Sequence, residues 1–314
     1  MFEEIINQSQ CAIASGKLLG LPTETVYGLG APITKIDLVD KVFAIKKRPL
    51  TNPLIVHVSS IEMAKRYVER WPQLAQDLCE AFWPGPLTLL VQKSELIDHR
   101  ITAGSPWVAL RMPDHDLTLR IISAFDQGFV APSANPYQKL SPTSAAMVQA
   151  YFSADDVMVI DGGPCKVGIE STVVQIINDQ EIAIARPGMI TQDQLQKNLL
   201  TSIKIKKASA VTSPSPGQSQ KHYQPKAPIV LALTRKLSLE EAREKLLAQH
   251  PELLLTHGTT LEIQQDPKQF AQSLYQQLHI LSTQADFILI CVNDLIKQQP
   301  GIIDRLTKAA TVIV

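Results

Sequence analysis

Polar residues crowd one short stretch near the start of the chain, where a proline and two glycines enclose them. The stretch reads Pro22-Thr23-Glu24-Thr25-Val26-Tyr27-Gly28-Leu29-Gly30 and carries two hydroxyls, a carboxylate and a phenol. Proline fixes one backbone angle and glycine permits unusual ones, so we expect a rigid loop that turns sharply. An ordinary turn needs only Gly, Pro, Asn or Asp. The stretch therefore predicts a binding loop, and a strand exit with incidental polar residues is the alternative.

Hydroxyl, arginine and histidine side chains recur later in the chain, each time beside an apolar segment stiffened by proline or glycine. The segments span residues 48–57, 82–88, 107–111, 129–135, 141–143, 168–174 and 185–188. Active sites are commonly built from polar groups that rigid elements bring together from several directions. These segments therefore predict one shared site, to which Arg48, His57 and Arg111 are among the contributors.

Alternating strand and helix patterns surround these polar groups over the first 200 residues or so. Strands are predicted at 17–21, 54–58, 87–91, 107–112, 128–131, 157–161, 171–177 and 182–186, and helices at 3–14, 35–47, 61–69, 73–82, 116–126, 143–151 and 191–200. Thr34 with Asp37 resembles a capping box for the second of these helices. Many strands with irregularly placed helices predict an α/β fold built on a large twisted mixed sheet.

The pattern breaks between residues 201 and 227, where Ser209 to Gln220 is rich in Ser, Pro, Gly and Gln and reads as a linker. Strands at 229–233, 253–255 and 287–292 then alternate with helices at 238–249, 268–283 and 301–310. Ser238 and Glu241 form a capping-box pattern. This alternation predicts a small parallel sheet with right-handed crossovers. We expect a catalytic domain over 1–205, a linker over 206–227 and a C-terminal α/β domain over 228–314.

Composition argues against several classes of protein. The chain has 30 basic and 30 acidic residues and no net charge, which argues against a strongly basic nucleic-acid binder. Its four cysteines show no C-x-x-C spacing, and its N-terminus lacks an apolar signal core. We therefore expect a cytoplasmic protein without a zinc site or a disulfide framework. Trp83 and Cys165 are expected to be buried packing residues, and the run Lys204 to Ala208 a solvated face.

The segments from Pro22 to Gly188 together resemble the YrdC/Sua5 family of threonylcarbamoyl-AMP synthases. Ser215-Pro216-Gly217 and His222-Tyr223-Gln224-Pro225 resemble the linker of the longer Sua5 type. The resemblance implies a YrdC-like α/β fold with a smaller Rossmann-like C-terminal domain. It also implies a nucleotidyltransferase that uses L-threonine, bicarbonate and ATP with Mg²⁺ to make threonylcarbamoyl-AMP and pyrophosphate. That product would pass to the tRNA threonylcarbamoyl transferase machinery for t6A modification, with at most a weak tRNA contact by this chain.

The resemblance also implies roles for individual residues. Those placed around threonine are Thr25, His57, Arg111, Ser171 and the backbone at Ala131. Those placed around ATP are Arg48, Asn52, Ser133, Ser141, Arg186 and Tyr223. Lys46 and Lys47 add positive charge to the Arg48 loop, and the role of Glu24 is open between metal, amine and structure. Trp107 departs from the family, which usually has Thr or Ser there.

Two other functions compete with this one. The first is an RNA-binding or ribosome-assembly module built on the same sheet, which the neutral charge disfavours because tight polyanion binding needs many basic contacts. The second is a carbamoyltransferase-like enzyme, whose relatives carry zinc-finger cysteine pairs that this chain lacks. We also expect residues Lys221 to Tyr223 to fold over the site, with the linker acting as a lid.

Overall fold

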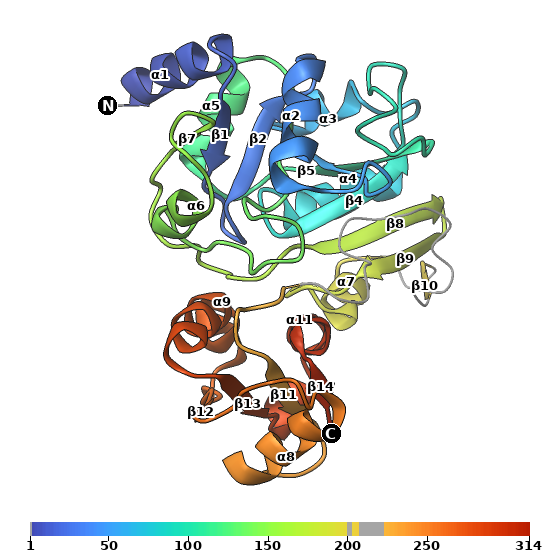
Figure 1. The fold of residues 1–314 in the computed structure, drawn as a ribbon. Coiled ribbons are helices and arrows are strands. Elements are labelled where there is room, and N and C mark those ends of the chain that lie inside the picture. The colour runs from blue at the N-terminus through green and yellow to red at the C-terminus, as the bar shows by residue number, and fades with distance from the viewer. Residues whose placement is uncertain (1, 200–202, 207–222) are drawn as a thin grey trace.

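The chain folds into two α/β units that lie one above the other in Figure 1. The computed structural model describes residues 2–199, 203–206 and 223–314. The larger, N-terminal unit contains a mixed sheet of ten strands, and the smaller, C-terminal unit contains a sheet of four strands. Among the described residues, no helix is both long and apolar enough to cross a membrane. Residues 207–222, and with them most of the predicted linker and lid, lie outside the described part.

The large sheet confirms the predicted mixed α/β architecture. Its strands are β1 (Leu18–Leu21), β2 (Gly28–Pro32), β3 (Ile55–His57), β4 (Leu87–Gln92), β5 (Trp107–Arg111), β6 (Phe129–Val130), β7 (Val157–Val159), β8 (Thr172–Asn178), β9 (Glu181–Arg186) and β10 (Lys204–Lys206). Their order in the sheet is β10-β9-β8-β4-β5-β3-β6-β2-β1-β7. The pairs β3–β5, β4–β8, β1–β7 and β9–β10 are parallel and the others antiparallel. Parallel pairing brings the carboxyl ends of β3 and β5 to the same edge.

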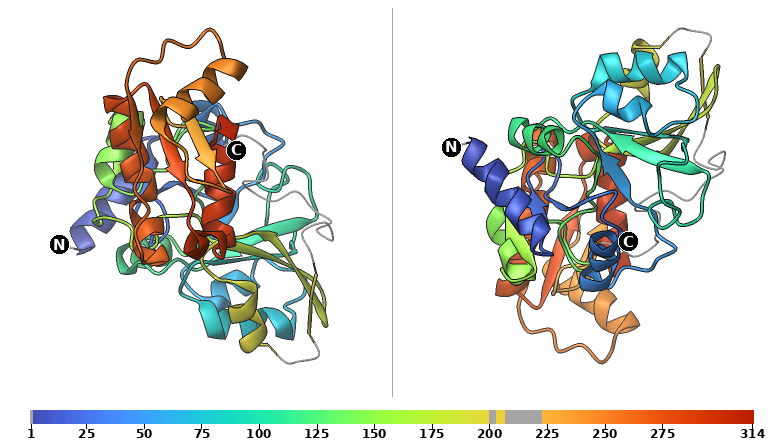
Figure 2. Two further views of the ribbon diagram at one scale, coloured as in Figure 1. Left: turned by 90° about the horizontal axis from the view of Figure 1, so that it is seen from below. Right: turned by 90° about the horizontal axis from the view of Figure 1, so that it is seen from above.

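Seven helices flank this sheet in the described part of the large unit. They are α1 (Phe2–Ala14), α2 (Ile36–Lys46), α3 (Ile61–Lys65), α4 (Gln73–Phe82), α5 (Asp116–Ala124), α6 (Ala145–Tyr151) and α7 (Gln192–Lys197). Leu74, Leu78 and Cys79 show how α4 buries one face against the core. Trp83, directly after α4, is 8% exposed, which confirms its predicted role in packing. The N-terminal helix α1 lies at the rim of the molecule in both views of Figure 2.

Three local predictions for the large unit need correction. Strand β2 was not predicted, because Gly28–Pro32 lacks the β-branched residues that usually mark a strand. The run at Lys204–Lys206 forms an edge strand rather than only a solvated face, although both lysines stay exposed. The Thr34–Asp37 capping box does not form: Lys35 is the N-cap without a side-chain bond, and the Thr34 hydroxyl donates to Gln127 instead.

The C-terminal unit is built on a sheet whose four strands are all parallel, as predicted. Its strands are β11 (Ile229–Ala232), β12 (Gly258–Thr260), β13 (Phe287–Cys291) and β14 (Val312–Ile313), in the order β12-β13-β11-β14. Its helices are α8 (Leu239–Gln249), α9 (Pro267–Gln284), α10 (Asp294–Lys297) and α11 (Pro300–Ala309). The capping box predicted for α8 is present, with Ser238 and Glu241 each bonding the backbone N–H of the other.

The strand predicted at 253–255 is wrong. Leu254 is 91% exposed in a loop, and the strand forms at β12 instead. Gly258 pairs with Phe287 of β13. A Cβ atom at Gly258 would lie only 2.1 Å from the Phe287 ring. The Phe287 ring occupies the space that a side chain at position 258 would need, so only glycine fits at this strand position. In a sequence pattern, a glycine indicates a turn rather than a strand.

The helices of the C-terminal unit divide between the two faces of its sheet. Helix α8 packs on one face, and α9 and α11 pack on the other, which is turned toward the large unit (Figure 1). The apolar cluster on the α9 side also contains Val26, Leu140 and Ile169 of the large unit. The two units therefore share an apolar cluster at their interface, and its burial favours their association.

Backbone segments of the two units approach each other closely at two glycines. A Cβ atom at Gly168, whose φ is +80°, would lie 2.4 Å from the carbonyl oxygen of Ala271 in α9. A Cβ atom at Gly301 in α11 would lie 2.5 Å from the carbonyl oxygen of Gly188. No ordinary side chain fits at such separations, so these glycines allow α9 and α11 to dock on the 168–188 region.

Candidate active site

One cavity collects side chains from the binding loop, from three strand ends and from the described end of the predicted linker. Its lining consists of Thr23, Val26, Gly28, Arg48, Pro53, Ile55, His57, Arg111, Ala131, Pro132, Ser133, Glu170, Arg186 and Tyr223. Among these are three guanidiniums, one imidazole and one carboxylate. The structure thus brings together most of the residues predicted for the site. Thr25, Asn52, Ser141 and Ser171 lie behind the lining and do not face the cavity directly.

Hydrogen bonds within the binding loop make it rigid, as its sequence predicts. The Thr23 hydroxyl accepts from the backbone N–H groups of Thr25 and Val26 and donates to the Val26 carbonyl. The Tyr27 phenol donates to the Gly163 carbonyl at 2.8 Å. Thr25 is fully buried, with its hydroxyl 3.0 Å from that of Thr23. The loop therefore presents a fixed wall, and Thr25 belongs to the layer beneath it.

Arg111 and His57 stand side by side at one end of the cavity. They are register partners at the ends of the parallel strands β5 and β3, so both project from the same face. The Arg111 guanidinium forms an ion pair with Glu24, with Nη2 2.7 Å from Oε2. The side chains are only 4% and 3% exposed. The question left open for Glu24 is thus answered in part: it fixes the arginine that the sequence predicted as a ligand.

Four buried polar atoms at this end have no hydrogen-bond partner within the described parts of the chain. They are Glu24 Oε1 and Oε2, His57 Nδ1 and Arg111 Nη2. The Glu24–Arg111 contact is ionic, since its atoms lack the alignment of a hydrogen bond. Burial and the Arg111 charge lower the pKa of His57 to about 3, so its imidazole is neutral near pH 7. Buried polar atoms are normally satisfied, so His57 Nδ1 and the Arg111 guanidinium, which both belong to the cavity lining, suit a small ligand with a carboxylate and other polar groups.

A second end of the cavity is strongly positive. Arg48 donates to Asn52 Oδ1 at 2.7 Å and to the Pro53 carbonyl at 2.8 Å, so Asn52 braces this arginine. Burial lowers the pKa of Arg48 to about 10, which still leaves it charged at neutral pH. Arg186, at the end of β9, donates to the backbone carbonyl and the hydroxyl of Ser171. Two buried guanidiniums in one cavity suit a ligand with several negative charges.

Lys46 does not reach the cavity, contrary to its expected contribution of charge. Its ammonium is buried and donates to the backbone carbonyls of Ser133 and Asn135. Burial and the nearby Arg48 charge lower the pKa of this lysine well below its ordinary value. Lys46 therefore braces the loop that carries Ala131 and Ser133 to the cavity. Lys47, one residue later, is exposed.

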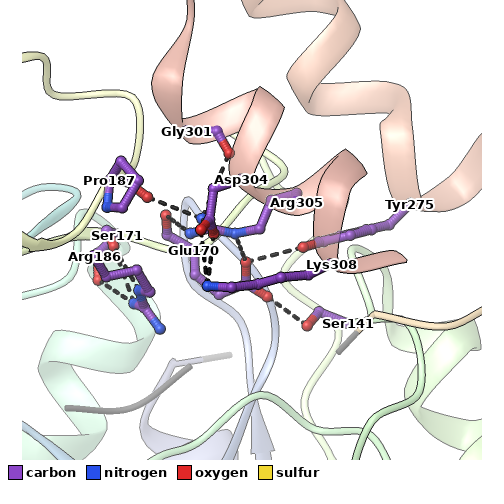
Figure 3. Close-up of polar contacts among 10 residues, drawn as sticks. All are labelled: Ser141, Glu170, Ser171, Arg186, Pro187, Tyr275, Gly301, Asp304, Arg305 and Lys308. Atoms are coloured by element: carbon purple, nitrogen blue, oxygen red, sulfur yellow. Dashed lines mark hydrogen bonds and ion pairs between the residues drawn. The ribbon is translucent and has the colours of Figure 1, made fainter. Parts of the chain in front are cut away.

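Sequence reasoning predicted Ser141 but missed Glu170 and its two partners in the C-terminal unit, Tyr275 and Arg305. Glu170 lines the cavity and accepts hydrogen bonds from Ser141, Tyr275 and Arg305 (Figure 3). It lies inside the 168–174 segment that the sequence singled out. Its charged partner follows 135 positions later, in the C-terminal unit. No local pattern in the sequence could have joined the two.

Comparison with known proteins identifies the class of enzyme. Residues 11–188 match the family of Sua5, YciO and YrdC, described as "Telomere recombination". Residues 190–311 match the family described as "Threonylcarbamoyl-AMP synthase, C-terminal domain". A YrdC-type sheet joined to that second domain defines an adenylate-forming synthase of two units.

Individual relatives agree with this class. The threonylcarbamoyl-AMP synthase of Pyrococcus abyssi is 38% identical over 244 residues, which cover 76% of this chain and 71% of the relative. That of Schizosaccharomyces pombe is 30% identical over 350 residues, covering 94% and 85%. The crystal structure of P. abyssi Sua5 complexed with L-threonine superposes with a TM-score of 0.83 and 32% identity, covering 98% and 96%.

The chain therefore belongs to the Sua5-type threonylcarbamoyl-AMP synthases. It is an ATP-using nucleotidyltransferase that makes threonylcarbamoyl-AMP for t6A modification of tRNA. The fold and the activity implied by the sequence resemblance are confirmed. These matches favour the synthase over the RNA-binding module and over the carbamoyltransferase-like enzyme.

Proposed function

We propose that the cavity binds L-threonine at its Arg111 end and ATP at its Arg48 and Arg186 end, and that the two ligands react where these ends meet. One observation carries this assignment. Three buried guanidiniums line a single cavity, with Arg111 beside His57 at one end and Arg48 and Arg186 at the other. The relative from P. abyssi, whose structure superposes on this chain, was crystallised with L-threonine.

At the threonine end, Arg111 offers the positive charge that the substrate carboxylate needs. A guanidinium binds a carboxylate through two parallel hydrogen bonds, and Glu24 limits the positions that this guanidinium can take. His57 and the backbone at Ala131 would complete the pocket around the remaining atoms of threonine, supported from behind by Thr25 and Ser171.

At the nucleotide end, Arg48 and Arg186 face the triphosphate in this proposal. Asn52, Ser133, Ser141 and Tyr223 would surround the rest of the nucleotide, some of them by holding the arginines or Glu170. The described residues contain no group of three or more His, Cys, Asp or Glu side chains that could hold a metal ion. Mg²⁺ therefore fits as a part of the MgATP substrate, held by phosphate oxygens and water, and offsets phosphate charge.

The reaction needs positioning more than a protein nucleophile. The threonine amine combines with bicarbonate to give a carbamate and water, and a carbamate oxygen then attacks the α-phosphate of ATP. The bond from that phosphorus to the bridging oxygen breaks, and pyrophosphate leaves with its electron pair. Rigid walls hold the two reactants in line, and the buried arginines stabilise the charge that develops on the phosphate oxygens.

We assign the chemistry to a catalytic domain over residues 1–205, followed by a linker over 206–227 and a C-terminal domain over 228–314. The threonylcarbamoyl-AMP product would be handed to the tRNA threonylcarbamoyl transferase machinery. A neutral chain gives little electrostatic attraction for tRNA itself, so any direct tRNA contact is weak. The cytoplasm is the fitting compartment, since ATP, threonine and the tRNA acceptor are there.

The test is product analysis with omission controls. We expect pyrophosphate release only when threonine, bicarbonate and MgATP are all present, and a threonylcarbamoyl-AMP mass in the same sample. Serine, which lacks the methyl group of threonine, is tested in place of threonine as a control for recognition of that methyl group. Release of pyrophosphate at the same rate without threonine would contradict the assignment of the threonine end.

A further inference from the structure

Arg305 is the most deeply buried charged residue of the C-terminal unit, and most of its contacts cross to the large unit. Its side chain is 0% exposed. From α11, Nε donates to Glu170 Oε2 at 2.7 Å, Nη2 donates to the Glu170 carbonyl at 3.1 Å, and Nη1 donates to the Pro187 carbonyl at 2.9 Å. Figure 3 shows its guanidinium pointing from the helix toward Glu170. One side chain therefore ties α11 to two segments beside the cavity.

Glu170 lines the cavity and connects Arg305 to two further residues. Its Oε2 also accepts from the Tyr275 phenol of α9 at 3.0 Å, and its Oε1 accepts from the Ser141 hydroxyl at 2.5 Å. Burial acts to raise the pKa of Glu170, but the charges of Arg305 and Arg186 outweigh burial and lower that pKa to about 2. The carboxylate is thus held charged between the C-terminal unit and Ser141.

Tyr223 is held by the same group of residues. Its ring stacks on that of Tyr275, with centroids 5.6 Å apart and planes at 28°. The Arg305 guanidinium carbon lies 5.5 Å from the centre of the Tyr223 ring, within the range of a cation–π contact. Arg305 therefore contacts both Glu170 and Tyr223, two residues that line the nucleotide end.

We propose that Arg305 is a positioning residue of the synthase, which sets the nucleotide end of the cavity from the C-terminal domain by holding Glu170 and Tyr223 in place. The positive charge of Arg305 also neutralises the Glu170 carboxylate. Arg186, which lies near the same carboxylate, therefore remains available to bind the triphosphate. The threonine end shares none of these contacts, because Arg111 is paired with Glu24. The proposal rests on the assignment of ATP to the Arg48 and Arg186 end.

The test compares substrate dependence in full-length variants. Arg305→Met keeps much of the side-chain volume and removes the charge. We expect it to raise KM for ATP by about tenfold or more, because truncating one partner of a buried pair is costly, and to leave KM for threonine within about twofold. Arg305→Lys keeps a charge but lacks the planar fork, and should fall between wild type and Arg305→Met.

The double variant Arg305→Met/Glu170→Gln removes the carboxylate that the single change leaves unbalanced. It should regain part of the lost ATP affinity, which a general loss of folding would not allow. Arg235→Met is the matched control, because Arg235 is 54% exposed and forms a surface ion pair with Glu241. It should behave as wild type.

Two outcomes would overturn the proposal. One is an equal change of KM for ATP and for threonine in Arg305→Met and Arg305→Lys, since a positioning role predicts a difference between the substrates. The other is wild-type kinetics in both variants. Failure of the proposed ligand assignment is separable from these outcomes, because it would appear as unchanged ATP binding in Arg186→Met, a variant in which Arg305 itself is intact.

Discussion

The two ends of the cavity are built in different ways. At the threonine end, Arg111, His57 and Glu24 all come from the large unit, and neighbouring strands or the binding loop hold them. At the nucleotide end, Glu170 and Tyr223 depend on Arg305 and Tyr275 of the C-terminal unit. A change at the domain interface should therefore affect ATP much more than threonine, which makes the two ends experimentally separable.

The largest effect is expected from Arg111→Met at the threonine end. The change removes the cation proposed for the threonine carboxylate and leaves Glu24 buried without its ion pair. Losses for a buried charged pair are about 2–5 kcal/mol, so kcat/KM for threonine should fall by at least about 30-fold. Steady-state kinetics with threonine varied at saturating ATP and bicarbonate would measure this.

The matched control for this change is the double variant Arg111→Met/Glu24→Gln. It removes the buried carboxylate that the single change leaves unpaired, and so restores stability without restoring a cation. If the double variant also regained threonine affinity, Arg111 would be a structural partner of Glu24 and not a ligand for the substrate.

The side chains at the Arg111 end of the cavity could mostly be predicted from the sequence, because the signals that position them are local. Arg111 and His57 end strong apolar strands, and the turn chemistry around Glu24 is contained in a few residues. The nucleotide end was predicted only in part. Glu170 and Arg305 are 135 positions apart, and their contact depends on how the two units dock. Sequence patterns report neighbours along the chain and give no information on such docking.

The errors in the fold have a similar origin. Strand β12 was missed because Gly258 is required by the Phe287 ring of the neighbouring strand, whereas its sequence suggests a turn. The Leu-rich run before it looks like a strand, yet Leu254 is exposed. In both places a tertiary contact overrides the local preference of the chain.

A smaller effect, on stability, is expected from Glu170→Gln. The folded-state pKa of Glu170 is lowered to about 2 from an ordinary value of 4.5. Its charge therefore contributes stability that is fully present above pH 4.5 and is lost as the pH falls toward 2. The contribution changes by at most about 1.4 kcal/mol per pH unit. Urea unfolding at several pH values should show wild type and Glu170→Gln converging below pH 4.5. A constant difference across this range would mean that the carboxylate is not held charged.

Gly301→Ala should give a still smaller effect, confined to the nucleotide end. Alanine favours a helix over glycine by about 1 kcal/mol, so α11 by itself would be stabilised. The new Cβ atom would, however, lie 2.5 Å from the Gly188 carbonyl oxygen and push α11 away from the large unit. We expect ATP affinity to fall several-fold while threonine affinity is retained, as measured by equilibrium binding. Unchanged ATP affinity would show that α11 can shift at the interface without affecting the ATP site.

The smallest effect is expected from His57→Gln, on the pH dependence of kcat/KM. Because burial and Arg111 lower its pKa to about 3, His57 stays neutral between about pH 6 and 8. The pH profiles of kcat/KM for wild type and His57→Gln should then differ in height but not in shape. In unfolding experiments, His57 should cost stability only as the pH falls from 6.5 toward 3, where the unfolded chain takes up the proton first. An inflection near pH 6.5 in the kcat/KM profile of the wild type that disappears in His57→Gln would contradict this.

The separation of the two ends is tested most directly by calorimetry of each ligand alone with two matched variants, Arg111→Met and Arg186→Met. Without bicarbonate and the second substrate no turnover occurs, so each titration reports binding only. We predict a crossed result, in which Arg111→Met loses threonine binding and keeps ATP binding, while Arg186→Met does the reverse. If each variant lost both ligands to the same extent while remaining folded, the cavity would not have two separately built ends.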